Sequence, residues 1–108
     1  MKTITINKQK FPFRITVSSL AKLEIETGYK VSEIDKMGEF QLILALLPIA
    51  INTGYRKLQE SQTVTREQIE DLIDEDPSCI ATIGELIASE MSEAVGMVNG
   101  ETVEDEKK

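Results

Sequence analysis

The sequence of 108 residues contains no histidine, no tryptophan and only one cysteine, and these absences limit what the chain can do. Without histidine, it cannot form the Ser–His or Cys–His pairs that activate a nucleophile. Cys79 has no second cysteine to pair with, so an intramolecular disulfide is excluded, as suits a reducing compartment. We therefore expect a binding protein rather than an enzyme.

The sequence also lacks a long apolar segment and a strongly basic balance. Its longest apolar run, from Phe40 to Ile51, is shorter than the roughly 20 residues that span a bilayer. Lys2 is not followed by an apolar segment, so we predict no secretory signal. The net charge of −7 disfavours nucleic acid as a ligand, because neutralising phosphates requires basic side chains. We therefore predict neither a membrane nor a nucleic acid as partner.

Charge is distributed unevenly along the chain. Residues 1–58 hold nine basic and five acidic side chains, a net charge of +4. Residues 59–108 hold three basic and fourteen acidic side chains, a net charge of −11. An acidic excess of this kind keeps a protein and its unassembled complexes soluble.

The spacing of apolar residues predicts one domain, with an N-terminal hairpin followed by helices. A chain of 108 residues with 41% apolar content is typical of a single globular domain. Alternating side chains predict a hairpin over 2–16, with strands near 2–6 and 11–16 and a turn at 7–10. Helical spacing predicts helices over about 18–27, 32–37, 39–58, 66–75 and 77–95. The predicted fold class is α+β and mostly α-helical, with the hairpin packed against four or five helices in a domain of residues 1–96, followed by a charged disordered tail over 97–108.

Capping residues predict where the helices begin and end. The expected N-caps are Ser18 or Ser19, Ser32, Thr65 in a capping box with Gln68, and Asp76 ahead of Pro77. Gly28 is expected to end the first helix, because glycine adopts a positive φ at little cost. The helix over 39–58 is apolar on nearly all sides, which places it at the centre of the core. Pro48 lacks an N–H and clashes one turn back, so we expect this helix to kink or split near Leu44 to Leu47.

A cluster of carboxylates is the densest chemical feature of the sequence. Its members are Glu67, Glu70, Asp71, Asp74, Glu75 and Asp76. A calcium-binding loop would alternate oxygen ligands and contain a glycine, whereas Leu72 and Ile73 interrupt this cluster, so we predict no metal site. We also identify no catalytic pair and no cofactor site. The cluster is either a solvated helix face or a docking surface for a basic partner, in which Glu70, Asp71 and Asp74 would be the contacts.

An apolar stripe along the last predicted helix is the second candidate site. It consists of Ile83, Leu86, Ile87, Met91 and Val95. Most of it is expected to be core, but the end from Met91 to Val98 extends beyond what the preceding short helices cover, and methionine suits adaptable binding surfaces. We therefore predict partner contact there, so that Ile87→Asp or Met91→Asp would weaken partner binding while helicity is retained.

Two smaller features each allow more than one interpretation. Gly84 and Ala88 are small residues four positions apart, which allow another helix to approach closely. That helix belongs to the same domain, to a partner or to a second copy of the chain, so a homo-oligomer stays open. Cys79 is early in the last predicted helix, where a helix N-terminus lowers a thiol pKa, but it equally suits a small buried apolar side chain.

The order of these segments carries a family resemblance. The chain opens with Met-Lys-Thr-Ile-Thr-Ile-Asn, and residues 20–28 contain the pattern Leu-x-x-Leu-Glu-x-x-Thr-Gly. An apolar helix is followed by the acidic segment 65–77, which contains Ile-Glu-Asp-Leu-Ile-Asp, and then by an amphipathic helix and a charged tail. Over about residues 1–95, this layout resembles the small tail assembly chaperones of long-tailed bacteriophages and prophages.

The resemblance implies a non-enzymatic role in building a phage tail. Such chaperones coat the long, helical, aggregation-prone tape measure protein and help to recruit tail tube subunits to it, and they are typically absent from the finished virion. The implied partners are therefore the tape measure protein and the tail tube protein, and the implied location is the cytoplasm of a bacterial host. Many members also exist in a frameshift-extended form, and this chain would match the short form. The family has no catalytic motif to carry over.

Alternatives from other classes remain. A long helical partner would need an apolar groove with a charged rim, which the last helix and the acidic cluster would supply. An acidic decoy that occupies a basic, nucleic-acid-binding protein is one alternative, and its binding would collapse at moderate salt. A structural phage tail or connector subunit is another, because the hairpin edges could pair in an assembly.

Overall fold

The computed structural model describes residues 2–99 of the chain, and side chains for residues 2–94. These residues form β1 (Lys2–Ile6), β2 (Gln9–Phe13), α1 (Val17–Thr27), the 3-10 helix η1 (Val31–Lys36), α2 (Glu39–Lys57), α3 (Arg66–Glu75), the 3-10 helix η2 (Pro77–Cys79) and α4 (Ile80–Asn99). The predicted class, α+β and mostly helical with a hairpin packed against helices, is confirmed.

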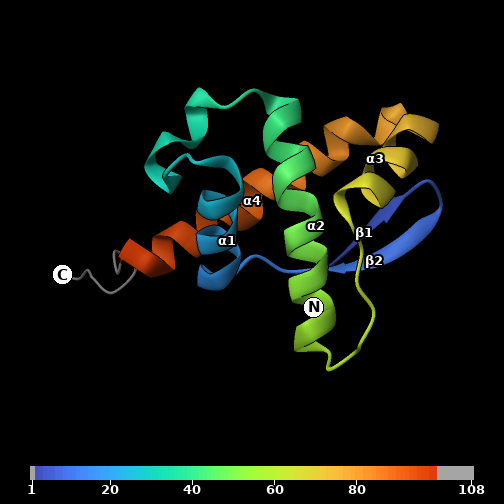
Figure 1. Ribbon diagram of the computed structural model, residues 1–108, viewed down its shortest axis with the longest axis horizontal. Coiled ribbons are helices and arrows are strands. Elements are labelled where there is room, and N and C mark those ends of the chain that lie inside the picture. Colours follow the sequence, from blue (N-terminus) through green and yellow to red (C-terminus); the bar gives the residue numbers. More distant parts are fainter. Residues whose placement is uncertain (1, 100–108) are drawn as a thin grey trace.

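Helix α2 is the centre of the fold. Figure 1 shows it crossing the middle of the molecule, with the hairpin and α3 on one side and α1 on the other, while α4 runs across behind it. It packs against β2, α1, α3 and α4. Its fully buried side chains include Leu46, Leu47 and Ile51, as expected for a helix that is apolar on nearly all sides. The helix runs through Pro48 without a break, so the expected split does not occur.

The hairpin has a tighter turn than predicted. Asn7 and Lys8 alone form it, with φ of 50° and 68°, which is the geometry of a two-residue hairpin loop. Strand β2 therefore begins at Gln9 rather than at 11 and ends at Phe13 rather than at 16. The strands pair antiparallel with Ile4 opposite Phe11, so the alternate apolar side chains share one face.

Helix α1 is capped by a residue other than the expected Ser18 or Ser19. Thr16 is the N-cap, and its hydroxyl accepts a hydrogen bond from the Ser19 amide at 3.4 Å. The Ser19 hydroxyl accepts from the Thr16 amide at 3.0 Å and lies 2.9 Å from the hydroxyl of Thr53 on α2. Ser19 is thus the third helical residue, where it completes a capping box with Thr16 and forms a buried link to α2. Gly28 ends α1 with φ of 79°, as expected.

The segment after α1 is shorter and tighter than an α-helix. The helix expected over 32–37 is the 3-10 helix η1, which begins at Val31, and Ser32 is not its cap. Instead, the Glu33 carboxylate accepts a hydrogen bond from the Lys30 amide at 3.0 Å. None of its residues is fully buried.

In the acidic half of the chain, helix α3 begins where it was predicted to, and helix α4 ends later than predicted. Thr65 and Gln68 form the expected capping box of α3. The preceding loop is held by Asn52, whose side chain donates to the Val64 carbonyl at 2.9 Å and accepts from its amide at 2.7 Å. Helix α4 runs to Asn99 rather than ending at 95, and the rest of the predicted tail, 100–108, lies outside the described residues.

The junction between α3 and α4 also differs from the prediction. Asp76 occupies the expected N-cap position ahead of Pro77, but its side chain accepts no hydrogen bond from the backbone of η2. It accepts hydrogen bonds from the Asn7 amide at 3.2 Å and from the Ser78 hydroxyl at 2.9 Å, which ties the hairpin turn to this junction. Pro77 starts η2 at the first helical position, where its missing N–H is harmless. No helix in the described part of the chain is long and apolar enough to cross a membrane.

Candidate functional site

An open groove separates α1 and η1 from α4. Its volume is about 1220 Å³, and it is lined by residues of α1, η1, the start of α2 and the middle of α4. Helices α1 and α4 each pack against α2 but have almost no contact with each other. The groove therefore exists because two helices cover the same central helix without meeting above it.

The walls and floor of the groove are mainly apolar. Side chains that line it while keeping solvent-exposed surface are Val17, Ala21, Val31, Ile34, Leu42 and Ala88. Val17 is 64% exposed, although it is a large apolar residue at the first turn of α1. The α4 wall includes Gly84, beside which the Glu39 carboxylate lies, and the small, exposed Ala88. The groove thus presents a continuous apolar surface bounded by helices.

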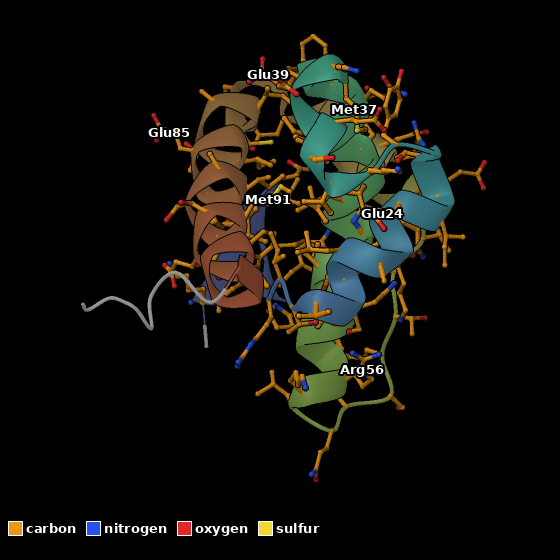
Figure 2. The ribbon with its side chains drawn as sticks, turned by 90° about the vertical axis from the view of Figure 1, so that its left-hand side faces the viewer. Glu24, Met37, Glu39, Arg56, Glu85 and Met91 are labelled. Carbon is orange, nitrogen blue, oxygen red and sulfur yellow. The ribbon has the colours of Figure 1, made fainter. Side chains whose placement is uncertain are left out.

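The rim of the groove is acidic. Its charged lining residues are Glu24 from α1, Asp35 from η1 and Glu39 from the first turn of α2, and no lysine or arginine among residues 2–94 lines it. Figure 2 shows Glu24 on the α1 side and Met91 on the α4 side, with Glu39 near one end and Glu85 turned away on the outer face of α4. Any ligand of the groove would therefore meet negative charge at its edge.

One rim carboxylate is held by nearby backbone, and a second reaches toward the opposite wall. The Glu24 carboxylate accepts a hydrogen bond from the Val31 amide at 2.7 Å, which ties the start of η1 to α1. A carboxylate oxygen of Glu39 lies 3.2 Å from where a Cβ at Gly84 would be, so the side chain reaches from α2 toward α4. Asp35 is exposed on η1.

The apolar stripe of α4 is divided between the core and the groove. Ile83 is 1% exposed and belongs to the core alone, and half-buried Leu86 packs against the core outside the groove. Ile87 and Met91 are 2% and 8% exposed and contribute to both. Val95 lies outside the residues with described side chains. Ile87→Asp would place a charge in the core and destabilise the fold, so a loss of partner binding in that variant would not identify the contact surface.

The acidic cluster is not part of the groove. Glu70, Asp71 and Asp74 lie on α3, which packs against α2 and η2, and none of the three lines the groove. Glu70 instead pairs with Arg66 one turn earlier, at 2.9 Å. Asp71 and Asp74 are exposed on the helix surface. The sequence analysis expected the acidic cluster at 67–76 to form the charged rim of the groove, but Glu24, Asp35 and Glu39 form it instead.

Sequence reasoning missed Glu24, Asp35 and Glu39 because they are spread over three elements. No spacing along the chain marks them as neighbours, and each is an ordinary exposed or half-buried acid in its own segment. The local signals for the groove were the small pair Gly84 and Ala88 and the stripe residues Ile87 and Met91, since all four line it.

Cys79 lies in η2 and is half-buried, away from the groove. Desolvation, followed by the nearby carboxylate of Asp76, raises the pKa of its thiol. The thiolate is therefore less populated than in a free cysteine, which is the opposite of activation at a helix N-terminus. Within the described residues, no group of three or more acidic or cysteine side chains is arranged to hold a metal ion.

Comparisons with known proteins leave the family open. No protein-family model, no curated protein and no solved structure matches the chain.

Proposed function

We propose that this protein is a non-enzymatic tail assembly chaperone of a long-tailed bacteriophage or prophage. It binds helices of the tape measure protein and helps to recruit tail tube subunits during tail assembly. The observation that carries the proposal is the open groove between α1, η1 and α4, which is apolar inside and acidic at its rim. An amphipathic helix buries its apolar stripe in a groove of this kind.

The family resemblance over about residues 1–95 favours the tape measure protein among all helical partners. A tape measure protein presents long amphipathic helices that would aggregate before the tail tube encloses them. A protein with net charge −7 that covers those helices would keep the complex soluble. The proposed place of action is therefore the cytoplasm of the bacterial host, before the tail is complete, with the chaperone absent from the finished virion.

The first test is a pull-down of the tagged chain from cells that express the neighbouring genes, with bound proteins identified by mass spectrometry. We expect a very long helical protein, with or without a tube-forming subunit. Recovery of a basic, nucleic-acid-binding protein in its place would contradict the proposal and support the acidic decoy. Abundant chain in purified phage tails would support a structural subunit.

A matched pair of variants tests whether the groove is the contact surface. Ala88 and Ala81 are both exposed on α4, but only Ala88 lines the groove. Ala88→Gln would project a longer side chain into the groove, so we expect tape measure recovery to fall about tenfold, the effect of losing ~1.4 kcal/mol of binding. Ala81→Gln should behave as the natural chain does. Equal recovery with both variants would place the contact surface elsewhere.

A further inference from the structure

The rim of the groove holds negative charge that no described side chain neutralises. Glu24, Asp35 and Glu39 line it, and none of them forms an ion pair with a described residue. We propose that the groove selects amphipathic helices whose apolar stripe is flanked by lysine or arginine, and that these three carboxylates determine that specificity. The inference rests on the proposed function and names the chemistry of the segment that the chaperone would bind.

The physical basis is the low dielectric of the apolar walls. Like charges around a concave apolar surface focus the electrostatic potential into it, so a basic flank is attracted and an acidic flank is repelled. The apolar walls supply affinity for any amphipathic helix, whereas the rim decides which flanking charge is accepted. In this proposal, the apolar wall residues provide the affinity for a helix, and the rim carboxylates provide the selectivity for its flanking charge.

The three carboxylates come from different elements around the groove, and one of them is held by the backbone. The 2.7 Å hydrogen bond from the Val31 amide holds Glu24 at the junction of α1 and η1. Glu39 extends toward Gly84 at the α4 wall. The carboxylates therefore lie on the α1, η1 and α2 sides of the groove, and that of Glu39 extends across to the α4 wall.

The chain's own acidic segments fit the groove poorly. Residues 100–108 contain four acidic side chains and two lysines, so the rim would repel them. A second copy of the chain would offer α4, whose charged side chains are Glu85, Glu90 and Glu93, or the acidic α3. A basic-flanked helix from a different protein is the occupant that complements the rim.

The test uses two synthetic helical peptides of about 18 residues, or about five turns. Both carry leucine at positions i, i+3, i+4 and i+7 along one face, and they differ only in having lysine or glutamate beside that stripe. Binding to the full chain is measured by fluorescence anisotropy. Each exposed charge pair changes Kd by roughly 1.5- to 5-fold, so with three carboxylates we expect the lysine peptide to bind about 3- to 100-fold tighter at low salt. The difference should shrink near 1 M salt, where the screening length is about 3 Å.

A charge-matched pair of triple variants locates the effect. The first triple variant neutralises the rim with Glu24→Gln, Asp35→Asn and Glu39→Gln. Its glutamine at position 24 keeps an acceptor for the Val31 amide. The control triple variant removes the same charge from α3, outside the groove, with Glu67→Gln, Asp71→Asn and Asp74→Asn. We expect only the first set to abolish the preference for lysine, with unchanged helicity by circular dichroism in both.

The outcomes separate this inference from the proposed function. Equal binding of both peptides, no binding of either, or equal loss of preference in both triple variants would overturn the inference. Recovery of a tape measure protein in the pull-down would still support the chaperone in each of those cases. The expected peptide result without any tape measure protein would support the charge selection and contradict the chaperone.

Discussion

At the scale of single residues, Gly54 allows the hairpin to reach the central helix. A Cβ at this position would lie 2.9 Å from the carbonyl carbon and the Cβ of Pro12, and 3.0 Å from the Phe13 nitrogen. The Arg14 amide, next along the chain, donates to the Ala50 carbonyl of α2 at 3.1 Å. Backbone of β2 and backbone of α2 are therefore in direct contact, which only a residue without a side chain permits.

We predict that Gly54→Ala destabilises the protein by about 1–3 kcal/mol, the usual cost of overpacking a core. Alanine is the better helix former by about 1 kcal/mol, but the atoms it would meet are backbone and a proline ring, which cannot move aside alone. Urea unfolding followed by circular dichroism measures the change, since the chain has no tryptophan.

Gly38→Ala is the matched control for that substitution. A Cβ at Gly38 meets no atom within 4 Å, and its φ of −67° suits any residue. We expect a change of at most about 1 kcal/mol there, from the weaker N-cap preference of alanine. A Gly54→Ala variant as stable as the Gly38→Ala variant would contradict the close packing of α2 on β2.

At the scale of elements, α4 serves two purposes with adjacent residues. Ile87 is 2% exposed and packs in the core cluster, whereas the next residue, Ala88, is exposed and lines the groove. In an α-helix, successive residues point about 100° apart, so one stripe seals the domain while its neighbour stays open to a ligand. Stability and binding are therefore separable on this helix.

We predict that Ile87→Ala lowers the free energy of unfolding by about 2–5 kcal/mol, as expected for truncating a buried isoleucine. Ala88→Gln should change it by no more than about 0.5 kcal/mol, because it is a surface substitution. Urea unfolding of both variants provides the measurement. A small effect at Ile87 would mean that this part of α4 is not packed in the core.

At the scale of the whole molecule, the first strand is tied to the last helix. The Lys2 ammonium pairs with the carboxylate of Glu90 and lies 3.8 Å from that of Glu93. The hydrogen bond to Glu90 raises the pKa of Lys2 above its ordinary 10.5, although desolvation acts in the opposite direction. Because the folded pKa is the higher one, this pair stabilises the fold below about pH 10.5 and the contribution is lost as Lys2 deprotonates at higher pH.

We predict that Lys2→Gln lowers the urea midpoint between pH 7 and pH 9, and that its difference from the natural chain shrinks above about pH 10.5. Lys10→Gln is the control, since Lys10 is exposed and forms no ion pair with a described residue. A Lys2→Gln difference that stays constant up to pH 12, or an equal effect at Lys10, would show that the pair does not act as described.

Local signals in the sequence determined most of the secondary structure. Residue periodicity predicted the hairpin and the helices, and the capping box at Thr65 and Gln68 marked the start of α3 within a residue. The apolar character of residues 39–58 identified the central helix. These features depend on neighbours along the chain, and so they can be recognised without knowing the fold.

Tertiary structure decided which polar side chains serve as caps and which acids surround the groove. Ser19 was expected to be an N-cap but is the third residue of α1 and also faces Thr53. Asp76 is at the expected N-cap position, but its side chain bonds to the Asn7 amide, a partner distant in sequence. Three acids, Glu24, Asp35 and Glu39, line the same groove only because the packing brings α1, η1 and α2 around it. A side chain's hydrogen bonds and charges act over a few ångströms in space, so their partners are set by how the helices pack and not by spacing along the chain.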